Sequence, residues 1–228
     1  MTTNWSMVVR AGKQQTPEQL AEICRIYWYP LYASIRQRGV GAHDAEDLIQ
    51  GFFAWLLTNN VVERADKNRG RFRVFLQVAL KQYCAREHRR ASARKRRPPR
   101  PLLSLDLAEA ETRWAASTCH VTPDRIFDQS WAVMVLSWSM DRLRDEYEQS
   151  GRGDRFRLLS PFMTDEKNAN REEVRQQLNI SESAFAMALS RLRQQFGKIL
   201  MEEIARTVDD PADIEDEMNH IWSSLAKP

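Results

Sequence analysis

Residues 71–97 constrain the fold more than any other stretch, because they begin as an apolar helix face and end as dense positive charge. In the first half, apolar side chains recur every three or four residues, which is the spacing of one face of an α-helix. These side chains are Phe72, Phe75, Leu76, Ala79, Leu80 and Tyr83. An apolar helix face needs a core, so we expect this helix to pack inside a helical domain.

The second half of the stretch is dominated by cations, with Glu87 as its one carboxylate. The cationic side chains are Arg86, Arg89, Arg90, Arg94, Lys95, Arg96 and Arg97. Such density is destabilised by self-repulsion unless a polyanion neutralises it, and a nucleic-acid backbone is the usual polyanion. The alternative is a solvated basic tail, but direct continuation from an amphipathic helix favours nucleic-acid binding.

The net charge of +3 hides an asymmetry along the chain. Residues 1–100 hold 19 Lys and Arg against 8 Asp and Glu, a net of +11, whereas residues 101–228 hold 15 against 23, a net of −8. We therefore expect the anion-binding surface in the N-terminal part. A chain of 228 residues allows one or two domains, and the low glycine content, with 8 Gly, favours a mostly helical fold.

Targeting signals and cofactor sites are not evident. No apolar run approaches the roughly 18 residues of a membrane span, and the N-terminus lacks the apolar region of a signal peptide, so we expect a cytoplasmic protein that does not bind membranes. Cys24, Cys84 and Cys119 are odd in number and far apart, as free thiols in a reducing compartment would be. Cys119 and His120 have no second ligand pair at zinc-site spacing, so we expect no metal or other cofactor.

The first predicted helix starts at a capping pattern formed by Thr16, Pro17 and Gln19. Pro30 is expected to kink this helix or to start a second one, because proline cannot donate an interior helical hydrogen bond.

Residues 42–57 should form the next helix, with Asp44, Asp47 and Gln50 on the face opposite its apolar stripe. The helix macrodipole accounts for Asp44 in the first turn. Asp47 and Gln50 sit deeper and three residues apart, one above the other, so this face is a candidate binding surface.

A linker is predicted at residues 98–121, because PPRP stops any helix and the sequence then changes from Arg-rich to acidic. It separates a domain of residues 1–97 from a domain of residues 122–228. We therefore expect an all-α protein with two helical domains joined by a flexible linker.

The second domain should begin with a helix from Thr122 and Pro123 to about Gln149. Farther on, a short helix, a turn and a longer helix capped by Ser181 match the helix-turn-helix spacing, whose second helix can lie in the DNA major groove. Many helical hairpins look similar, so this segment alone leaves DNA binding and a plain hairpin open. The acidic, amphipathic residues 209–228 are expected to pack on this domain or on a partner. Their acidic face is expected to be solvated, and the alternative is that it shields a basic surface.

Taken together, these segments resemble the extracytoplasmic-function (ECF) group of the sigma-70 family, and most closely its planctomycete-type branch. The resemblance rests on DAEDLIQGFF, RGRFRVFLQVAL and LNISESAFAMALSRLRQQF in this order, with YWYPLYASIRQRG and TPDRIFDQSWA, and extends from Trp5 to Leu225. It implies a non-enzymatic initiation factor that binds the bacterial RNA polymerase core and promoter DNA. It also implies an inhibitory anti-sigma protein as a partner, released by signalling or by regulated proteolysis.

The resemblance also assigns residues in the first domain. Asp47 and Gln50, with Asp44 beside them, would dock on the polymerase clamp helices. Capture of a flipped base of the minus-ten element would fall to Asp66, Lys67, Asn68 and Arg69. Phosphates of the opened strand would be held by Arg71, Arg73, Arg86, Arg89 and Arg90.

In the second domain the resemblance implies a minus-thirty-five reader. Phosphates would be held by Ser181 and Arg191, with Arg193 and Lys198 nearby. Bases would be read by Glu182, Ser183, Ala186, Met187 and Ser190.

Two departures from the family pattern stand out. Relatives usually carry a carboxylate where this chain has Gly51, and a cation in the middle of the recognition helix where this chain has Phe185 to Ala188. Without that cation there is no bidentate guanine contact, so recognition would rest on thymine methyls, on DNA shape or on the first domain. The alternative is that the second domain has lost sequence reading altogether.

The alternative function is a sigma-like helix-turn-helix regulator, or a protein-binding module without initiation activity. An enzyme is not expected, because the sequence offers no evident nucleophile–base set, phosphate-binding glycine loop or metal-ligand cluster.

Overall fold

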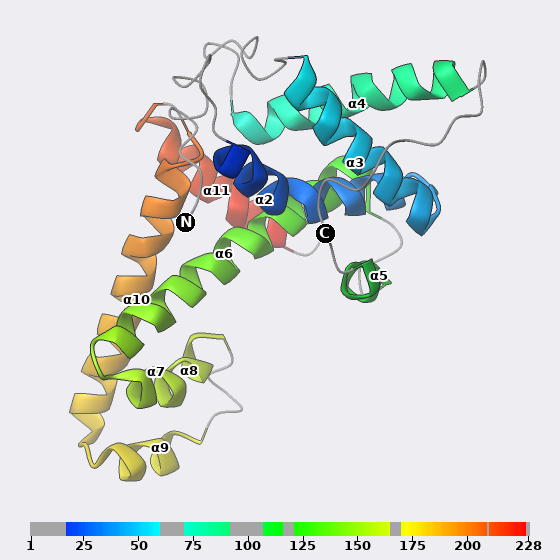
Figure 1. Cartoon of the computed structure of the whole chain (residues 1–228). Helices are drawn as coiled ribbons and strands as arrows, with labels where there is room; N and C mark the ends of the chain where they lie inside the picture. Colours follow the sequence, from blue (N-terminus) through cyan, green and yellow to red (C-terminus); the bar gives the residue numbers. More distant parts are fainter. Residues whose placement is uncertain are drawn as a thin grey trace. The chain divides into compact units, whose positions relative to one another are not determined.

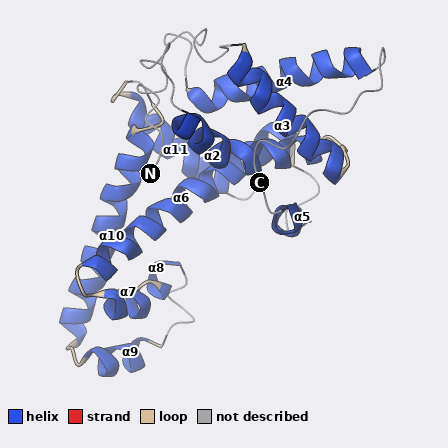
Figure 2. Cartoon of the chain, viewed as in Figure 1, coloured by secondary structure: helices blue, strands red, loops and turns tan. Residues whose placement is uncertain are grey.

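The computed structural model describes residues 17–59, 71–91, 107–115, 121–164, 170–208 and 210–226. Within these ranges every regular element is an α-helix and no strand occurs (Figures 1 and 2). The predicted all-α class is therefore confirmed. None of the described helices combines the length and the apolar character that a membrane span requires.

The chain forms two compact units, one made of Met1–Met134 with Ala205–Pro228 and the other of Val135–Ile204. The unit boundaries fall near the middle of helix α6 (Pro123–Gln149) and at the end of helix α10 (Glu182–Ala205). The predicted division at residues 98–121 stays a prediction. The C-terminal residues were expected on the second domain or on a partner, but they join the unit of the N-terminal helices.

The first unit has its core between three helices near the N-terminus. They are α2 (Pro17–Arg36), α3 (Ala42–Thr58) and α4 (Phe72–Ala91). Fully buried side chains, each stabilising the fold by about 1.5–3 kcal/mol, come from all three helices. The most buried are Leu31, Tyr32, Ile35, Ile49, Phe52, Phe53, Leu56 and Leu76. The predicted apolar stripe of α4 is buried, except that Phe75 is half-buried.

Pro30 lies inside α2, which runs as one helix. The alternative that Pro30 starts a second helix was therefore wrong. Tyr29, Leu31 and Tyr32 beside it are buried, and this packing offsets the hydrogen bond that proline cannot donate.

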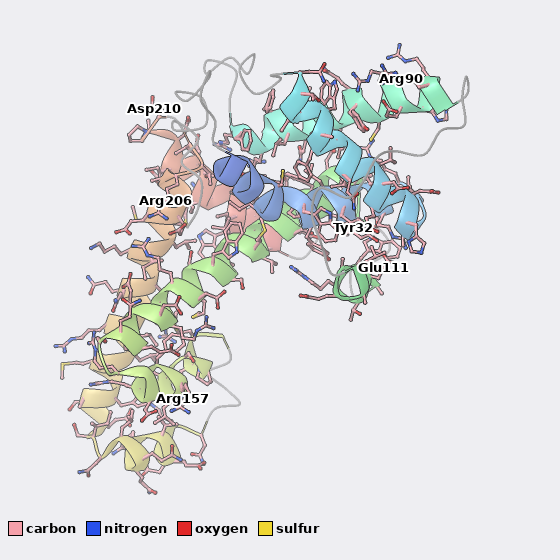
Figure 3. The ribbon with its side chains drawn as sticks, in the orientation of Figure 1. Tyr32, Arg90, Glu111, Arg157, Arg206 and Asp210 are labelled. Atoms are coloured by element: carbon pink, nitrogen blue, oxygen red, sulfur yellow. The ribbon has the colours of Figure 1, made fainter. Side chains whose placement is uncertain are left out.

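Part of the predicted linker is a helix, α5 (Leu107–Ala115), which packs on α2 and α3. Arg36 donates from Nε and Nη2 to the two carboxylate oxygens of Glu111, at 2.7 and 2.8 Å, and Tyr32 donates its hydroxyl to Glu111 Oε1 at 2.5 Å (Figure 3). The Arg36 guanidinium also lies 4.1 Å above the ring of Trp114. Hydrogen bonding by Arg36 lowers the pKa of Glu111, which keeps the carboxylate ionised and the helix held in place.

Gly51 of α3 lies where the Tyr83 hydroxyl of α4 approaches the helix backbone. A Cβ on Gly51 would overlap the Tyr83 hydroxyl oxygen and lie 3.4 Å from Cζ. The Tyr83 ring is 7% exposed and packs at 5.7 Å from the ring of Phe52. Packing therefore accounts for the glycine at this departure from the family pattern.

Replacing Gly51 by alanine is expected to destabilise the first unit by about 1–3 kcal/mol, since overpacking outweighs the better helix propensity of alanine. In a Tyr83→Phe background, where the hydroxyl is absent, the same substitution should lower the free energy of unfolding much less. Urea unfolding of the four proteins measures the coupling, and equal costs in both backgrounds would contradict the packing explanation.

The second unit is built from the C-terminal half of α6 and four further elements. These are α7 (Gly153–Leu159), α8 (Pro161–Thr164), α9 (Arg171–Leu178) and most of α10. Its core contains Leu143, Tyr147, Phe156, Leu159, Phe162, Phe185, Leu189, Leu192 and Ile199. Arg142 of α6 reaches Glu202 at 2.6 Å and Glu203 at 2.9 Å on α10, which ties these helices together.

The turn between α9 and α10 has the local chemistry that the sequence predicted. Asn179 takes the left-handed conformation, with φ 50° and ψ 50°, which asparagine tolerates better than most residues. The Ser181 hydroxyl accepts a hydrogen bond from the Ala184 amide at 3.2 Å. The predicted Ser181 cap is therefore confirmed.

Candidate nucleic-acid interface

Helix α4 uses one side for contacts with the first turns of α6. Lys81 forms an ion pair with Asp124 at 2.7 Å, and Gln77 donates to Asp128 at 3.3 Å. Arg73 reaches the same Asp128 at 3.0 Å. Because these three residues are spaced four apart, they form one row along α4, and α6 occupies that row.

Another side of α4 carries solvent-exposed side chains. Val74 and Val78, at 39% and 47% exposed, continue toward the exposed side chains of Gln82, Ala85 and Arg89. This row begins with two valines and ends with a cation. It leads to the arginine-rich last turn, where Figure 3 labels Arg90.

Aromatic rings support the last turns of α4. The Arg86 guanidinium lies 5.0 Å from the ring centroid of Trp55 and 5.3 Å from that of Tyr83. Arg90 is exposed and pairs with Glu87 at 3.1 Å. Stacking on two rings restricts the Arg86 side chain, so a bound phosphate would order it at a smaller entropic cost.

Trp55 was not predicted as part of this site. From the sequence it was assigned neither to the apolar stripe of this helix nor to any site. Its half-exposed ring contributes to the surface because α4 ends beside it.

Arg71 and Arg73, at the start of α4, are bound by carboxylates of α11 (Asp213–Leu225). Arg73 donates from Nε to Glu217 Oε1 at 2.7 Å, and Arg71 Nε lies 2.9 Å from Glu217 Oε2. Asp216 lies 3.6 Å from Arg71. Phosphate binding by these two arginines stays a prediction, and in this structure Arg73 is only 5% exposed.

Glu217 was not predicted as part of any site, although a signal was present. It lies on the same helix face as Ile214 and Ile221, where an amphipathic helix normally carries apolar residues. A carboxylate at such a position requires a cationic partner.

The predicted polymerase-binding residues lie on α3. Asp44 and Asp47 are exposed, and Gln50 is half-buried and donates to Glu46 at 3.2 Å. The first half of this helix therefore presents two exposed carboxylates, and the Gln50 amide follows them at its middle.

Residues predicted to read the minus-thirty-five element are exposed and run from Ser181, just before α10, to Lys198 in the second half of that helix. They are Ser181, Glu182, Ser183, Ala186, Met187, Ser190, Arg191, Arg193 and Lys198. Glu182 is paired with Arg171 at 3.1 Å and with Arg175 at 3.2 Å. Arg193 donates to the Phe162 carbonyl at 3.0 Å.

With Glu182 engaged, the remaining exposed face of this helix is uncharged in its first two turns. It consists of Ser183, Ala186, Met187 and Ser190, with Met187 55% exposed. A face of this kind offers hydroxyls and small apolar groups to a ligand.

The predicted base-flipping loop, Asp66, Lys67, Asn68 and Arg69, lies outside the described residues. The same holds for the cations from Arg94 to Arg97 and for the pair Cys119 and His120.

Ser224, His220 and Asp128 lie close together but do not form a proton relay. Ser224 Oγ lies 3.2 Å from His220 Nε2, and Asp128 Oδ1 lies 3.4 Å from the same nitrogen. Activation of a serine needs the base and its orienting carboxylate on different ring nitrogens. Among the residues with described positions, no group of three His, Cys, Asp or Glu side chains could hold a metal ion.

The first unit thus carries an arginine-rich helix end on aromatic rings and an acidic face on α3. The second unit, by itself, carries an uncharged face on α10. Comparison with protein-family models, with curated proteins and with solved structures finds no match to this chain.

Proposed function

We propose that the protein is an ECF-type sigma factor, a non-enzymatic subunit that directs core RNA polymerase to promoters and helps to open the DNA. The observation that carries the proposal is the end of α4, where Arg86 is stacked on Trp55 and Tyr83 beside the exposed Arg89 and Arg90. Cations on a rigid helix hold phosphates in register. They also make binding depend on salt.

The other two surfaces would bind polymerase and recognise the minus-thirty-five element. Asp44, Asp47 and Gln50 on α3 would contact polymerase, and α9 with α10 would act as a helix-turn-helix on the minus-thirty-five element. Because the exposed face of α10 carries Ala186 and Met187, thymine methyl groups are its natural contacts. The protein would act in the cytoplasm. An anti-sigma protein would bind and inhibit it until it is released by signalling or by regulated proteolysis.

The second candidate is a helix-turn-helix regulator or a protein-binding module without initiation activity. The engagement of Glu182 by Arg171 and Arg175 favours it, since this leaves no charged group in the first two exposed turns of α10 for base reading. A regulator would bind duplex DNA unaided, whereas the proposed sigma factor needs polymerase.

Transcription in vitro tests the proposal. Core polymerase and the full chain are incubated with fragmented DNA from the source organism, and the 5′ ends of the RNA are sequenced. The proposed function predicts start sites that share two upstream elements. Polymerase binding without defined starts, or starts that do not depend on the protein, would contradict it.

Asp47→Ala combined with Gln50→Ala tests the docking face. We expect about tenfold weaker polymerase binding, because removing about 1.4 kcal/mol of interface energy changes affinity tenfold. The matched control is Glu148→Ala with Gln149→Ala, the same change of a carboxylate and an amide on an exposed turn of α6. Unchanged affinity of the α3 variant, measured by competition with a second sigma factor, would remove this face from the interface.

A further inference from the structure

The carboxylate of Glu217 is enclosed by two arginines of α4. Its side chain is 1% exposed, and its oxygens lie 2.7 Å from Arg73 Nε and 2.9 Å from Arg71 Nε. Arg73 Nη2 adds a third contact at 3.3 Å. This is the geometry in which arginine also binds phosphate oxygens.

Stability of the fold alone does not call for a carboxylate at this position. The neighbours of Glu217 on the same face, Ile214 and Ile221, are apolar, and Ile221 is 0% exposed. A buried ion pair is usually no more stabilising than apolar side chains of similar size. The charge of Glu217 is therefore better explained by what it does to Arg71 and Arg73.

Asp216 strengthens the same effect from the solvent side. Its side chain is 73% exposed and lies 3.6 Å from Arg71 Nη2. Together, Glu217 and Asp216 bring two negative charges to the two positive charges of Arg71 and Arg73. With α11 in place, these arginines offer no net positive charge to a polyanion.

Helix α11 also makes polar contacts with α6. Arg125 of α6 donates to the Ala226 carbonyl at 3.2 Å, and His220 lies 3.4 Å from Asp128. The chain enters α11 through a short segment around Asp210, which accepts a hydrogen bond from the Ala212 amide at 2.9 Å (Figure 3). Trp222, on the outer side of α11, is 50% exposed.

We propose that α11 is an autoinhibitory clamp, in which Glu217 and Asp216 compete with DNA phosphates for Arg71 and Arg73. The inference rests on the proposed function, because it takes these arginines as part of the surface for the opened strand. The apparent affinity for single-stranded DNA equals the affinity of the open form multiplied by the fraction of molecules in which the clamp is open. Binding to polymerase or to the opened strand would displace α11.

The test compares four full-length proteins: wild type, Glu217→Gln, Asp216→Asn and Glu215→Gln. The Glu215 variant is the matched control, since it removes one negative charge from an exposed position on the opposite side of α11. Binding of a fluorescent oligothymidylate is measured by anisotropy over a range of salt concentrations.

We expect Glu217→Gln to bind about fivefold more tightly than wild type, Asp216→Asn about twofold, and Glu215→Gln no more tightly. The salt slope should steepen for Glu217→Gln by about 0.7 for each arginine that becomes available to a phosphate. A merely structural role of α11 would leave the slope unchanged or weaken binding.

A failure of the clamp and a failure of the proposed function give different results. Asp216→Asn removes an exposed carboxylate and keeps the fold, so it tests the clamp even if Glu217→Gln unfolds. Unchanged affinity in both variants would overturn the clamp, whatever the outcome of transcription. Conversely, tighter binding by both variants without any polymerase-dependent initiation would overturn the proposed function and leave the clamp standing.

Discussion

Replacement of Phe185 by alanine is expected to destabilise the second unit by about 3–5 kcal/mol, the usual cost of removing a buried aromatic ring. Phe185 is 0% exposed, and its ring lies 5.1 Å from that of Phe162 in an edge-to-face arrangement. Arg171 lies 4.9 Å above the same ring. The substitution would therefore remove the contact that joins α8, α9 and the start of α10.

Urea unfolding followed by far-UV circular dichroism measures the effect. Met187→Ala is the matched control, because it shortens an apolar side chain two residues away that is 55% exposed, and it should change stability by less than about 0.5 kcal/mol. If α10 contacts promoter DNA, Met187→Ala should alter promoter choice without altering stability. Equal destabilisation by the two substitutions would contradict the placement of Phe185 in the core and of Met187 on the surface of α10.

Replacement of Arg73 by leucine is expected to destabilise the first unit by about 3 kcal/mol, since breaking a buried ion pair leaves an uncompensated charge. Glu217 would keep only Arg71, and Asp128 would lose its partner at 3.0 Å. The Arg73 guanidinium also lies 5.5 Å from the ring centroid of Trp131, and that contact would be lost.

The double substitution Arg73→Leu with Glu217→Leu should recover most of this loss, because it removes the buried charge on both sides and keeps apolar volume. The unfolding free energies of the wild type, the two single variants and the double variant form a mutant cycle. If the double variant were as unstable as the sum of the single variants, Arg73 and Glu217 would not be coupled.

Local sequence patterns were sufficient for most of the helices. The stripe of apolar residues predicted a helix at 42–57, and α3 runs from Ala42 to Thr58. The capping pattern at Thr122 and Pro123 predicted the start of α6, and Ser181 caps α10 as expected. Periodicity and caps act over a few residues, so they are visible without knowledge of the rest of the fold.

The surroundings of the candidate site could not be predicted in the same way. Arg73 was expected to bind DNA phosphates. It is buried against Glu217, which lies 144 positions away in the sequence. Helix α5 was hidden in the predicted linker because its docking depends on Arg36 and Tyr32 of α2. Gly51 had no explanation in the sequence, since the Tyr83 hydroxyl that excludes a Cβ comes from another helix.

The membership of the first unit has a consequence for synthesis of the chain. Its residues come from both ends, Met1–Met134 and Ala205–Pro228, so its last helix leaves the ribosome only after the second unit has been made. Until then, Arg71 and Arg73 lack the carboxylates of α11, and the growing chain presents them to any nearby polyanion. Closing a loop of this length adds an entropic cost, and α11 is therefore expected to dock late in folding.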